Sequence, residues 1–217
     1  MNAPLLTINQ LGYEAEGKVI LKDIDFSVEE GEFVTITGPS GSGKSTLLKI
    51  IASMLSQTSG EILYQNKRVE DYEPTSYRKE VSYCFQTATL FDKTVEDNLA
   101  FPYEIRNQTF DKQKALSALN EVGLGEEYLA KSVNTLSGGE KQRVALIRNL
   151  LFLPKVILLD EVTSALDSEN QEIVRKLIHT LNHEQGVTVL WVTHNPVEIQ
   201  LSSRIIQLVN GEMEVSK

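Results

Sequence analysis

The chain has 217 residues, of which 41% are hydrophobic and 24% are charged, and its formal net charge is −9. This length suits one globular domain with a substantial core, or one domain with an inserted lobe. The net negative charge argues against a protein that binds nucleic acid through a basic face, so no nucleic-acid partner is expected.

Residues 1–18 contain no basic segment followed by an apolar one, so no signal peptide is predicted. No part of the chain approaches the roughly 18 consecutive apolar residues of a membrane-spanning helix. If the protein works at a membrane, another chain is expected to supply the membrane-spanning part. The only cysteine, Cys84, cannot form an internal disulfide, which suits a reducing cytosol.

Strand and helix patterns alternate along the chain. Alternating apolar residues predict short strands over 5–13, 19–28 and 32–38, then a Gly-rich loop, a helix over 46–55 and a strand pair near 61–69. The stretch 87–153 is mostly helical in pattern, notably over 110–124 and 140–152. A continuously apolar strand follows at 156–161, a helix at 168–185, a strand at 187–194 and a hairpin at 204–215 with its turn at Asn210 and Gly211.

This order predicts an α/β fold, in which a largely parallel sheet is covered on both faces. We expect a single domain over residues 1–217. Its α/β core would comprise about 1–86 and 154–217, with an antiparallel β part near the N-terminus. The helical stretch 87–153 would form a lobe inserted into that core.

The Gly-rich loop matches the phosphate-loop pattern G-x-x-x-x-G-K-[ST] and has the required strand before it and helix after it. It consists of Gly38, Pro39, Ser40, Gly41, Ser42, Gly43, Lys44, Ser45 and Thr46. Its glycines let successive backbone N–H groups converge on phosphate oxygens. Lys44 can reach the β and γ phosphates, and Ser45 can ligate Mg²⁺. The sequence therefore predicts nucleotide binding rather than a purely structural turn.

Polar residues follow two later strands at the ends where open α/β sheets bind ligands. The apolar strand at 156–161 delivers Asp160, which would hold Mg²⁺, and Glu161, which would orient or deprotonate the attacking water. His194 ends the strand at 187–194 and is a further catalytic candidate. Away from this edge, Trp191 is expected in the core. His179 and His183, spaced i,i+4 with no third ligand nearby, are expected on a solvated face.

Taken together, these motifs resemble the ATP-binding-cassette (ABC) family over essentially the whole chain. LSGGEKQR at 136–143 is similar to the family's signature sequence, Gln86 to its Q-loop glutamine and Ser164–Asp167 to its D-loop. The resemblance implies ATP hydrolysis with Mg²⁺ and a catalytic and metal-binding role for Gln86. It also implies that Tyr13 stacks on adenine, which we favour over the alternative that the ring serves packing alone. Glu140, Lys141 and Val162 depart from the common pattern at positions where little effect is expected.

The resemblance also explains why one chain carries two anion-binding segments. In this family two cassettes associate head to tail, and the signature of one subunit covers the nucleotide bound to the other. Ser137, Gly138 and Gly139 would then offer a hydroxyl group, backbone N–H groups and a helix N-terminus to the partner's γ-phosphate. A monomer would bind ATP but hydrolyse it poorly.

Among cassette proteins, the sequence favours the ATPase subunit of a transporter with a separate integral membrane permease. Such a subunit is peripheral and lies at the cytoplasmic face of the inner membrane. DNLAFPYEIRN at 97–107 and VLWVTH at 189–194 resemble the small bacterial ATP-binding subunits of iron exporters. Other small exporters, lipoprotein-release transporters and soluble ATPases of iron–sulfur assembly remain alternatives. The segment 87–101 after Gln86 also carries Leu90, Phe91 and Val95. These residues either pack inside the lobe or, as we expect, are exposed and line a groove for a short helix of the permease.

Overall fold

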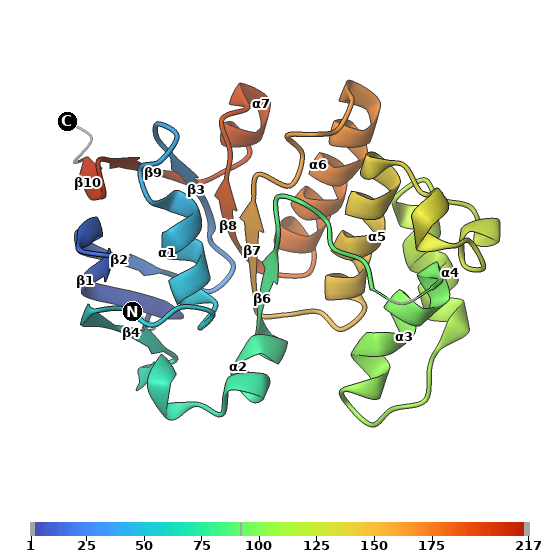
Figure 1. Ribbon diagram of the computed structural model, residues 1–217, viewed down its shortest axis with the longest axis horizontal. Helices are drawn as coiled ribbons and strands as arrows, with labels where there is room; N and C mark the ends of the chain where they lie inside the picture. Colours follow the sequence, from blue (N-terminus) through green and yellow to red (C-terminus); the bar gives the residue numbers. More distant parts are fainter. Residues whose placement is uncertain (1–2, 92, 215–217) are drawn as a thin grey trace.

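The computed structural model describes residues 3–91 and 93–214. Its larger sheet has the strand order β10-β9-β3-β8-β7-β6 (Figure 1). Only the β9–β10 pair of this sheet is antiparallel, and the other neighbouring strands run parallel. The strands are β3 (Phe33–Thr37), β6 (Val81–Cys84), β7 (Val156–Asp160), β8 (Thr188–Val192), β9 (Arg204–Val209) and β10 (Glu212–Glu214). The predicted hairpin is thus β9 and β10, and its last residue, 215, lies outside the described residues.

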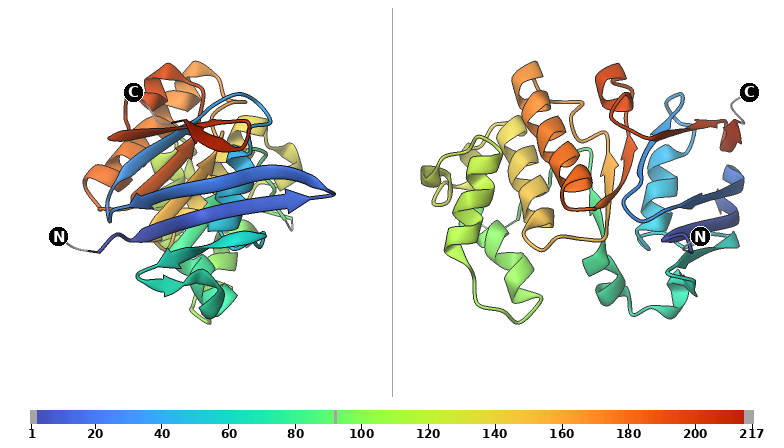
Figure 2. Two further views of the ribbon diagram at one scale, coloured as in Figure 1. Left: turned by 90° about the vertical axis from the view of Figure 1, so that its left-hand side faces the viewer. Right: turned by 180° about the vertical axis from the view of Figure 1, so that it is seen from behind.

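A second sheet is antiparallel and has the strand order β2-β1-β4-β5. Its strands are β1 (Leu6–Ala15), β2 (Lys18–Val28), β4 (Ser59–Tyr64) and β5 (Lys67–Arg68). The left-hand view of Figure 2 shows the long β1 and β2 lying across the larger sheet. β1 is longer than predicted because it continues to a tight turn at Glu16 and Gly17, both of which have positive φ.

The helices are α1 (Lys44–Ile51), α2 (Pro74–Glu80), α3 (Val95–Glu104), α4 (Lys112–Glu121), α5 (Gly138–Leu150), α6 (Ser168–His183) and α7 (Pro196–Ile199). Short 3₁₀ turns are η1 (Val69–Asp71), η2 (Glu126–Tyr128) and η3 (Val133–Thr135). α2 was not predicted, because it buries only Tyr77 and so has no apolar period. The prediction that the first helix reaches residue 55 was wrong, since Ser53 adopts a left-handed φ of 54°.

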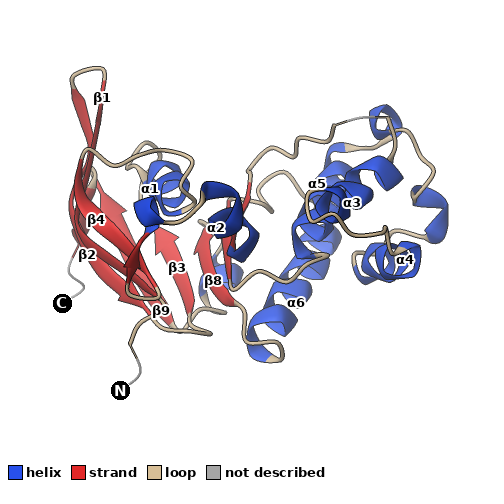
Figure 3. Cartoon of the chain, turned by 90° about the horizontal axis from the view of Figure 1, so that it is seen from below, coloured by secondary structure: helices blue, strands red, loops and turns tan. Residues whose placement is uncertain are grey.

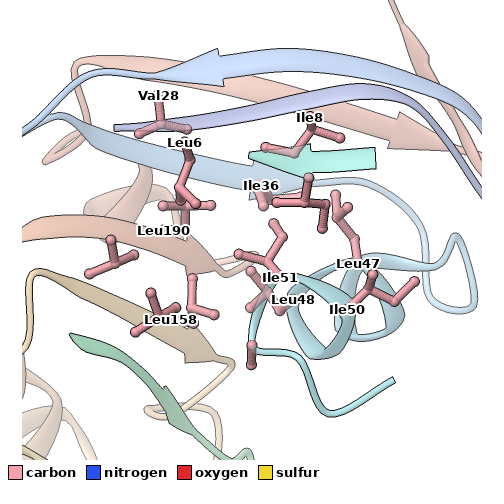
Figure 4. Close-up of a cluster of buried hydrophobic side chains, with 14 of the residues drawn as sticks. Leu6, Ile8, Val28, Ile36, Leu47, Leu48, Ile50, Ile51, Leu158 and Leu190 are labelled. Atoms are coloured by element: carbon pink, nitrogen blue, oxygen red, sulfur yellow. The ribbon is translucent and has the colours of Figure 1, made fainter. Parts of the chain in front are cut away.

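Side chains of the parallel strands alternate between two hydrophobic clusters. Leu158 and Leu190 pack with α1 in a cluster that fills the space between the two sheets (Figure 4). Leu159 and Trp191, their neighbours in sequence, point to the opposite face, where α6 covers the sheet. Each such side chain contributes about 1.5–3 kcal/mol by leaving water. Trp191 is fully buried, so its prediction as a core residue is confirmed.

A third cluster holds α3, α4 and α5 together, beyond the edge of the larger sheet (Figure 3). α5 belongs to two clusters, because Val144 and Ile147 face this one whereas Leu146 faces the sheet. Val95 at the start of α3 is fully buried here. The expectation that Val95 is exposed was therefore wrong. Within the described ranges, no helix has both the length and the hydropathy that a membrane span requires.

Candidate functional site

The phosphate loop connects the end of β3 to the start of α1. Gly38 has a φ of 140°, and a Cβ at this position would lie 1.9 Å from the carbonyl oxygen of Leu208. Gly43 caps α1 with a φ of 97°, and a Cβ there would lie 2.6 Å from Cδ2 of Leu21. These two positions require glycine because both the backbone conformation and the space exclude a side chain.

Lys44 lies inside this loop and is only 5% exposed. Its Nζ donates hydrogen bonds of 2.8 Å to the carbonyl oxygens of Gly38 and Pro39. Burial lowers the pKa of Lys44, and the nearby Glu161 and Asp160 partly oppose that shift. A buried ammonium group held only by neutral carbonyls is well placed to exchange them for phosphate oxygens.

Asp160 ends β7 beside the loop and is nearly buried. The hydroxyl of Ser45 donates to Oδ1 of Asp160 at 2.9 Å, and the hydroxyl of Tyr83 donates to Oδ2 at 2.6 Å. Burial, followed by this bond to Asp160, raises the pKa of Tyr83, so its hydroxyl remains a donor at neutral pH. Both oxygens of the carboxylate therefore have fixed directions.

Glu161 follows directly and is held by two candidate residues from the segments that follow β6 and β8. Nε2 of Gln86 donates to Oε2 of Glu161 at 2.9 Å, and Nε2 of His194 lies 3.3 Å from Oε1. The backbone N–H of Glu161 donates to the carbonyl oxygen of Val192 on β8 at 3.0 Å. Glu161 has a φ of 48°, which a non-glycine residue adopts only where the surroundings enforce it.

Two residues at this edge were missed by the sequence analysis. No sequence motif marks Tyr83 as functional, because it lies within the short strand β6. Glu198 lies on α7, is fully buried, and accepts hydrogen bonds from the hydroxyls of Thr163 and Thr193. Only the burial of an acidic residue marks Glu198 as unusual, and burial is not readable from the sequence.

Tyr13 lies on β1, opposite Leu21 of β2 in the strand register. Leu21 is the residue that a side chain at Gly43 would meet, so Tyr13 belongs to the wall beside the phosphate loop. Its ring is partly buried against the cluster between the sheets. This position is compatible both with packing and with contact to a nucleotide base.

The LSGGEKQR segment begins α5 on the other side of β7 and β8 from the phosphate loop (Figure 1). Ser137 caps the helix: its Oγ accepts from the N–H of Glu140 at 3.3 Å, and its N–H donates to Oε2 of Glu140 at 2.7 Å. Ser137 and Gly138 are exposed, and a Cβ on Gly138 would meet no atom within 4 Å. The helix N-terminus is therefore open to an anion from outside the chain.

Ser45 and Asp160 supply oxygen ligands beside the loop, as a small hard cation such as Mg²⁺ requires. In the described part of the chain, no group of three or more His, Cys, Asp or Glu residues is arranged to hold a metal ion. The single carboxylate of Asp160 fits Mg²⁺, which is bound through one or two carboxylates together with substrate phosphates. His179 and His183 are both exposed, as expected for a solvated face.

Comparison with known proteins identifies the family. The family model described as "ABC transporter" matches residues 21–164. The chain belongs to the ABC transporter family. It is 50% identical over 218 residues to the probable iron export ATP-binding protein FetA of Escherichia coli (strain K12), covering the whole chain and 97% of that protein. It is also 40% identical to the spermidine/putrescine import ATP-binding protein PotA of Spiroplasma citri, of which it spans 61%.

Solved ABC structures share the fold. An ATP-binding cassette determined as a dimer in a post-hydrolysis state, bound to ADP and Pi, has a TM-score of 0.88 and 34% identity, covering 98% of this chain and 97% of that chain. A bacterial Atm1-family ABC exporter with ATP bound has a TM-score of 0.90 at 26% identity, and this chain covers 39% of it. The predicted α/β cassette fold is therefore confirmed. The chain is an ABC transporter ATP-binding subunit with ATPase activity.

The cap at Ser137 generates a prediction about pH. Hydrogen bonds from the hydroxyl of Tyr128 and the backbone N–H of Ser137 lower the pKa of Glu140 from 4.5 to about 2. The ionised carboxylate therefore stabilises the folded state fully above pH 4.5, and this contribution is lost as the pH falls toward 2. Glu140→Gln should be less stable than wild type at neutral pH, with the difference shrinking below pH 4.5.

Urea unfolding at a series of pH values and constant ionic strength measures this difference. Glu104→Gln is the control, because it removes the same charge from an exposed position of α3. A difference for Glu140→Gln that stays constant down to the acid limit would contradict the role given to the carboxylate.

Proposed function

We propose that this chain is the ATPase subunit of an iron exporter. Iron is proposed as the transported substrate because the whole chain is 50% identical to a protein named as a probable iron export ATP-binding protein. The relative named for spermidine and putrescine import is less similar, and the chain spans only 61% of it. The chain itself needs no iron ligands, because the subunit supplies energy and the permease forms the path.

In this proposal the phosphate loop, 38–46, holds the ATP phosphates and Tyr13 stacks on the adenine. Ser45 and Asp160 would hold Mg²⁺, with Gln86 reaching it from the segment after β6. A Mg²⁺ ion held there would neutralise charge on the phosphates. Glu161 orients and accepts a proton from the attacking water, and His194 fixes the Glu161 carboxylate through its 3.3 Å contact.

A transport assay tests both the chemistry and the cargo. Inside-out membrane vesicles that contain this chain and its permease should accumulate radioactive iron when ATP is added, because export then runs into the vesicle. Glu161→Gln should still bind ATP but lose about 10²–10⁴-fold in turnover and in uptake, since an amide cannot accept the proton. Vesicles that hydrolyse ATP normally but accumulate no iron would reject iron as the cargo.

We also propose that two copies form a head-to-tail dimer in which each LSGGEKQR segment covers the partner's ATP. Three observations support this. The N-terminus of α5 is exposed, it lies across β7 and β8 from the chain's own phosphate loop, and a related cassette was solved as a dimer. The exposed cap formed by Ser137 and Gly138 supplies the anion-binding groups of that second contact.

Ser137→Arg tests the dimer, because a long cation at this position would occupy the space of the partner's γ-phosphate. Glu161→Gln alone should accumulate as an ATP-bound dimer in size exclusion. The double variant Glu161→Gln, Ser137→Arg should bind ATP with unchanged affinity but remain monomeric. Gln113→Arg, an exposed change on α4, is the control for added charge and bulk. Loss of ATP binding in Ser137→Arg would place Ser137 in its own chain's pocket instead.

We propose that the permease binds a groove between the sheet and the helical lobe. Bound to the permease, the chain would lie at the cytoplasmic face of the inner membrane. This groove has a volume of about 510 Å³ and is lined by α2, α3 and α5. Phe91, Phe101 and Ile105 give it apolar walls, with Phe91 and Phe101 packed edge to face at 4.8 Å. Arg78, Lys79, Arg106 and Arg148 make it basic, although the chain is acidic overall.

No carboxylate is found among the described residues that line this groove. The charge and the apolar walls therefore fit a short permease helix that carries acidic as well as apolar side chains. Of the three apolar residues expected to bind that helix, Phe91 lines the groove, Leu90 is partly buried in the lobe and Val95 is in its core.

Phe91→Asp and Ile105→Asp should each abolish co-purification with the co-expressed permease. Each places a charge on the apolar wall, and Ile105 is 46% exposed, so its substitution should not disturb folding. ATP binding by the isolated chain should be unchanged. Leu153→Asp is the matched control, because Leu153 is an apolar residue that is 53% exposed and does not line the groove. Normal permease binding by both groove variants would move the docking site elsewhere.

A further inference from the structure

Glu198 is a carboxylate in a place where carboxylates are rarely found. Its side chain has no solvent exposure, although it lies on the four-residue helix α7 near the surface. None of the ion pairs among the described residues includes Glu198. Burying a carboxylate without a cation is costly, and an apolar side chain would fill the same space at lower free energy.

Hydrogen bonds from two threonine hydroxyls offset part of the cost of burying this carboxylate. Oγ1 of Thr163 donates to one carboxylate oxygen at 2.6 Å, and Oγ1 of Thr193 donates to the other. Thr163 and Thr193 are each 3% exposed, so water does not compete for these bonds. Hydrogen bonds to an ionised acceptor are stronger than those between neutral groups, and they strengthen further in a dry environment.

The two threonines belong to the segments that carry the catalytic candidates. Thr163 lies two residues after Glu161, and Thr193 directly precedes His194. Glu198 therefore connects the segment that follows β7 to the segment that follows β8. The same two segments carry Glu161 and His194, which lie 3.3 Å apart. Gln171 of α6 braces the same two segments: its amide donates to the carbonyl of Thr163 and accepts from the side chain of Asn195.

Glu161 needs such support because its backbone conformation is unfavourable for a residue with a side chain. Its φ is 48°, and its N–H is held by the carbonyl of Val192, next to Thr193. The bonds to Glu198 oppose relaxation of the segment that follows Glu161. They also fix the strand end from which His194 projects.

We propose that Glu198 is a positioning residue for ATP hydrolysis. By binding Thr163 and Thr193 with one carboxylate, it sets the distance between Glu161 and His194. Glu198 contacts neither nucleotide nor water in this role. The inference rests on the catalytic roles proposed for Glu161 and His194.

Substitution of the threonines tests this role with little effect on folding. Thr193→Val and Thr163→Val keep the side-chain shape but remove one hydroxyl, and each should lower kcat about 10-fold, because small displacements of catalytic groups cost up to about 10²-fold. ATP affinity should not change. Thr193→Ser keeps the hydroxyl and should retain wild-type kcat. Thr35→Val is the matched control, because the buried hydroxyl of Thr35 on β3 has no hydrogen-bond partner among the described residues.

A double-variant comparison separates positioning from general stability. Glu198→Ala should lower kcat by about 10- to 100-fold in the wild type. In a His194→Ala background the fold loss should be clearly smaller, because one of the two residues that Glu198 positions is already absent. An equal fold loss in both backgrounds would overturn the proposal, as would wild-type kcat in both threonine-to-valine variants. If Glu161→Gln itself kept full turnover, the proposed catalytic assignment would fail, and that result is distinct from failure of the role of Glu198.

Discussion

The hydrogen bond from Ser45 to Asp160 depends on a parallel sheet whose central strands end level with one another. Ser45 follows β3, Asp160 ends β7, and β8 lies between these two strands. The parallel register aligns Ile36 with Val192 and Val192 with Asp160, so the three strands reach the same edge together. Every catalytic candidate is attached to one of these ends or to the adjacent β6. A slip of one residue would turn Asp160 away from the loop.

At this edge the polar groups satisfy one another within the chain. Lys44 donates to carbonyls of its own loop, and Ser45 and Tyr83 donate to Asp160. Glu161 accepts a hydrogen bond from Gln86 and contacts His194. This arrangement limits the cost of burying charge before a ligand arrives. The ATP that this site is proposed to hold would replace the carbonyl contacts of Lys44 with contacts to phosphate oxygens.

The helical lobe is connected to this edge through β6. Gln142 of α5 donates to the carbonyl of Phe85, directly before Gln86, and Asn149 of the same helix donates to the carbonyl of Tyr83. α5 also has Ser137 as its N-cap, and Arg148 of α5 lines the groove proposed to bind the permease. One helix thus links the segment proposed to cover the partner's ATP, the proposed metal-binding glutamine and the proposed docking groove. A rotation of the lobe would therefore move all three of these sites together.

The sequence by itself determined the phosphate loop, the acidic end of β7 and the alternation that produces a parallel sheet, because each depends on residue types at short, fixed spacings. It also indicated His194 by its place at the end of a strand, and Gln86 and the α5 signature through family resemblance. Only the tertiary structure decided that Tyr83 binds Asp160, that Glu198 bridges Thr163 and Thr193, and that Val95 is core while Phe91 lines a groove. These contacts join residues far apart in the chain. Their formation depends on strand order, helix placement and burial, which local periodicity does not specify.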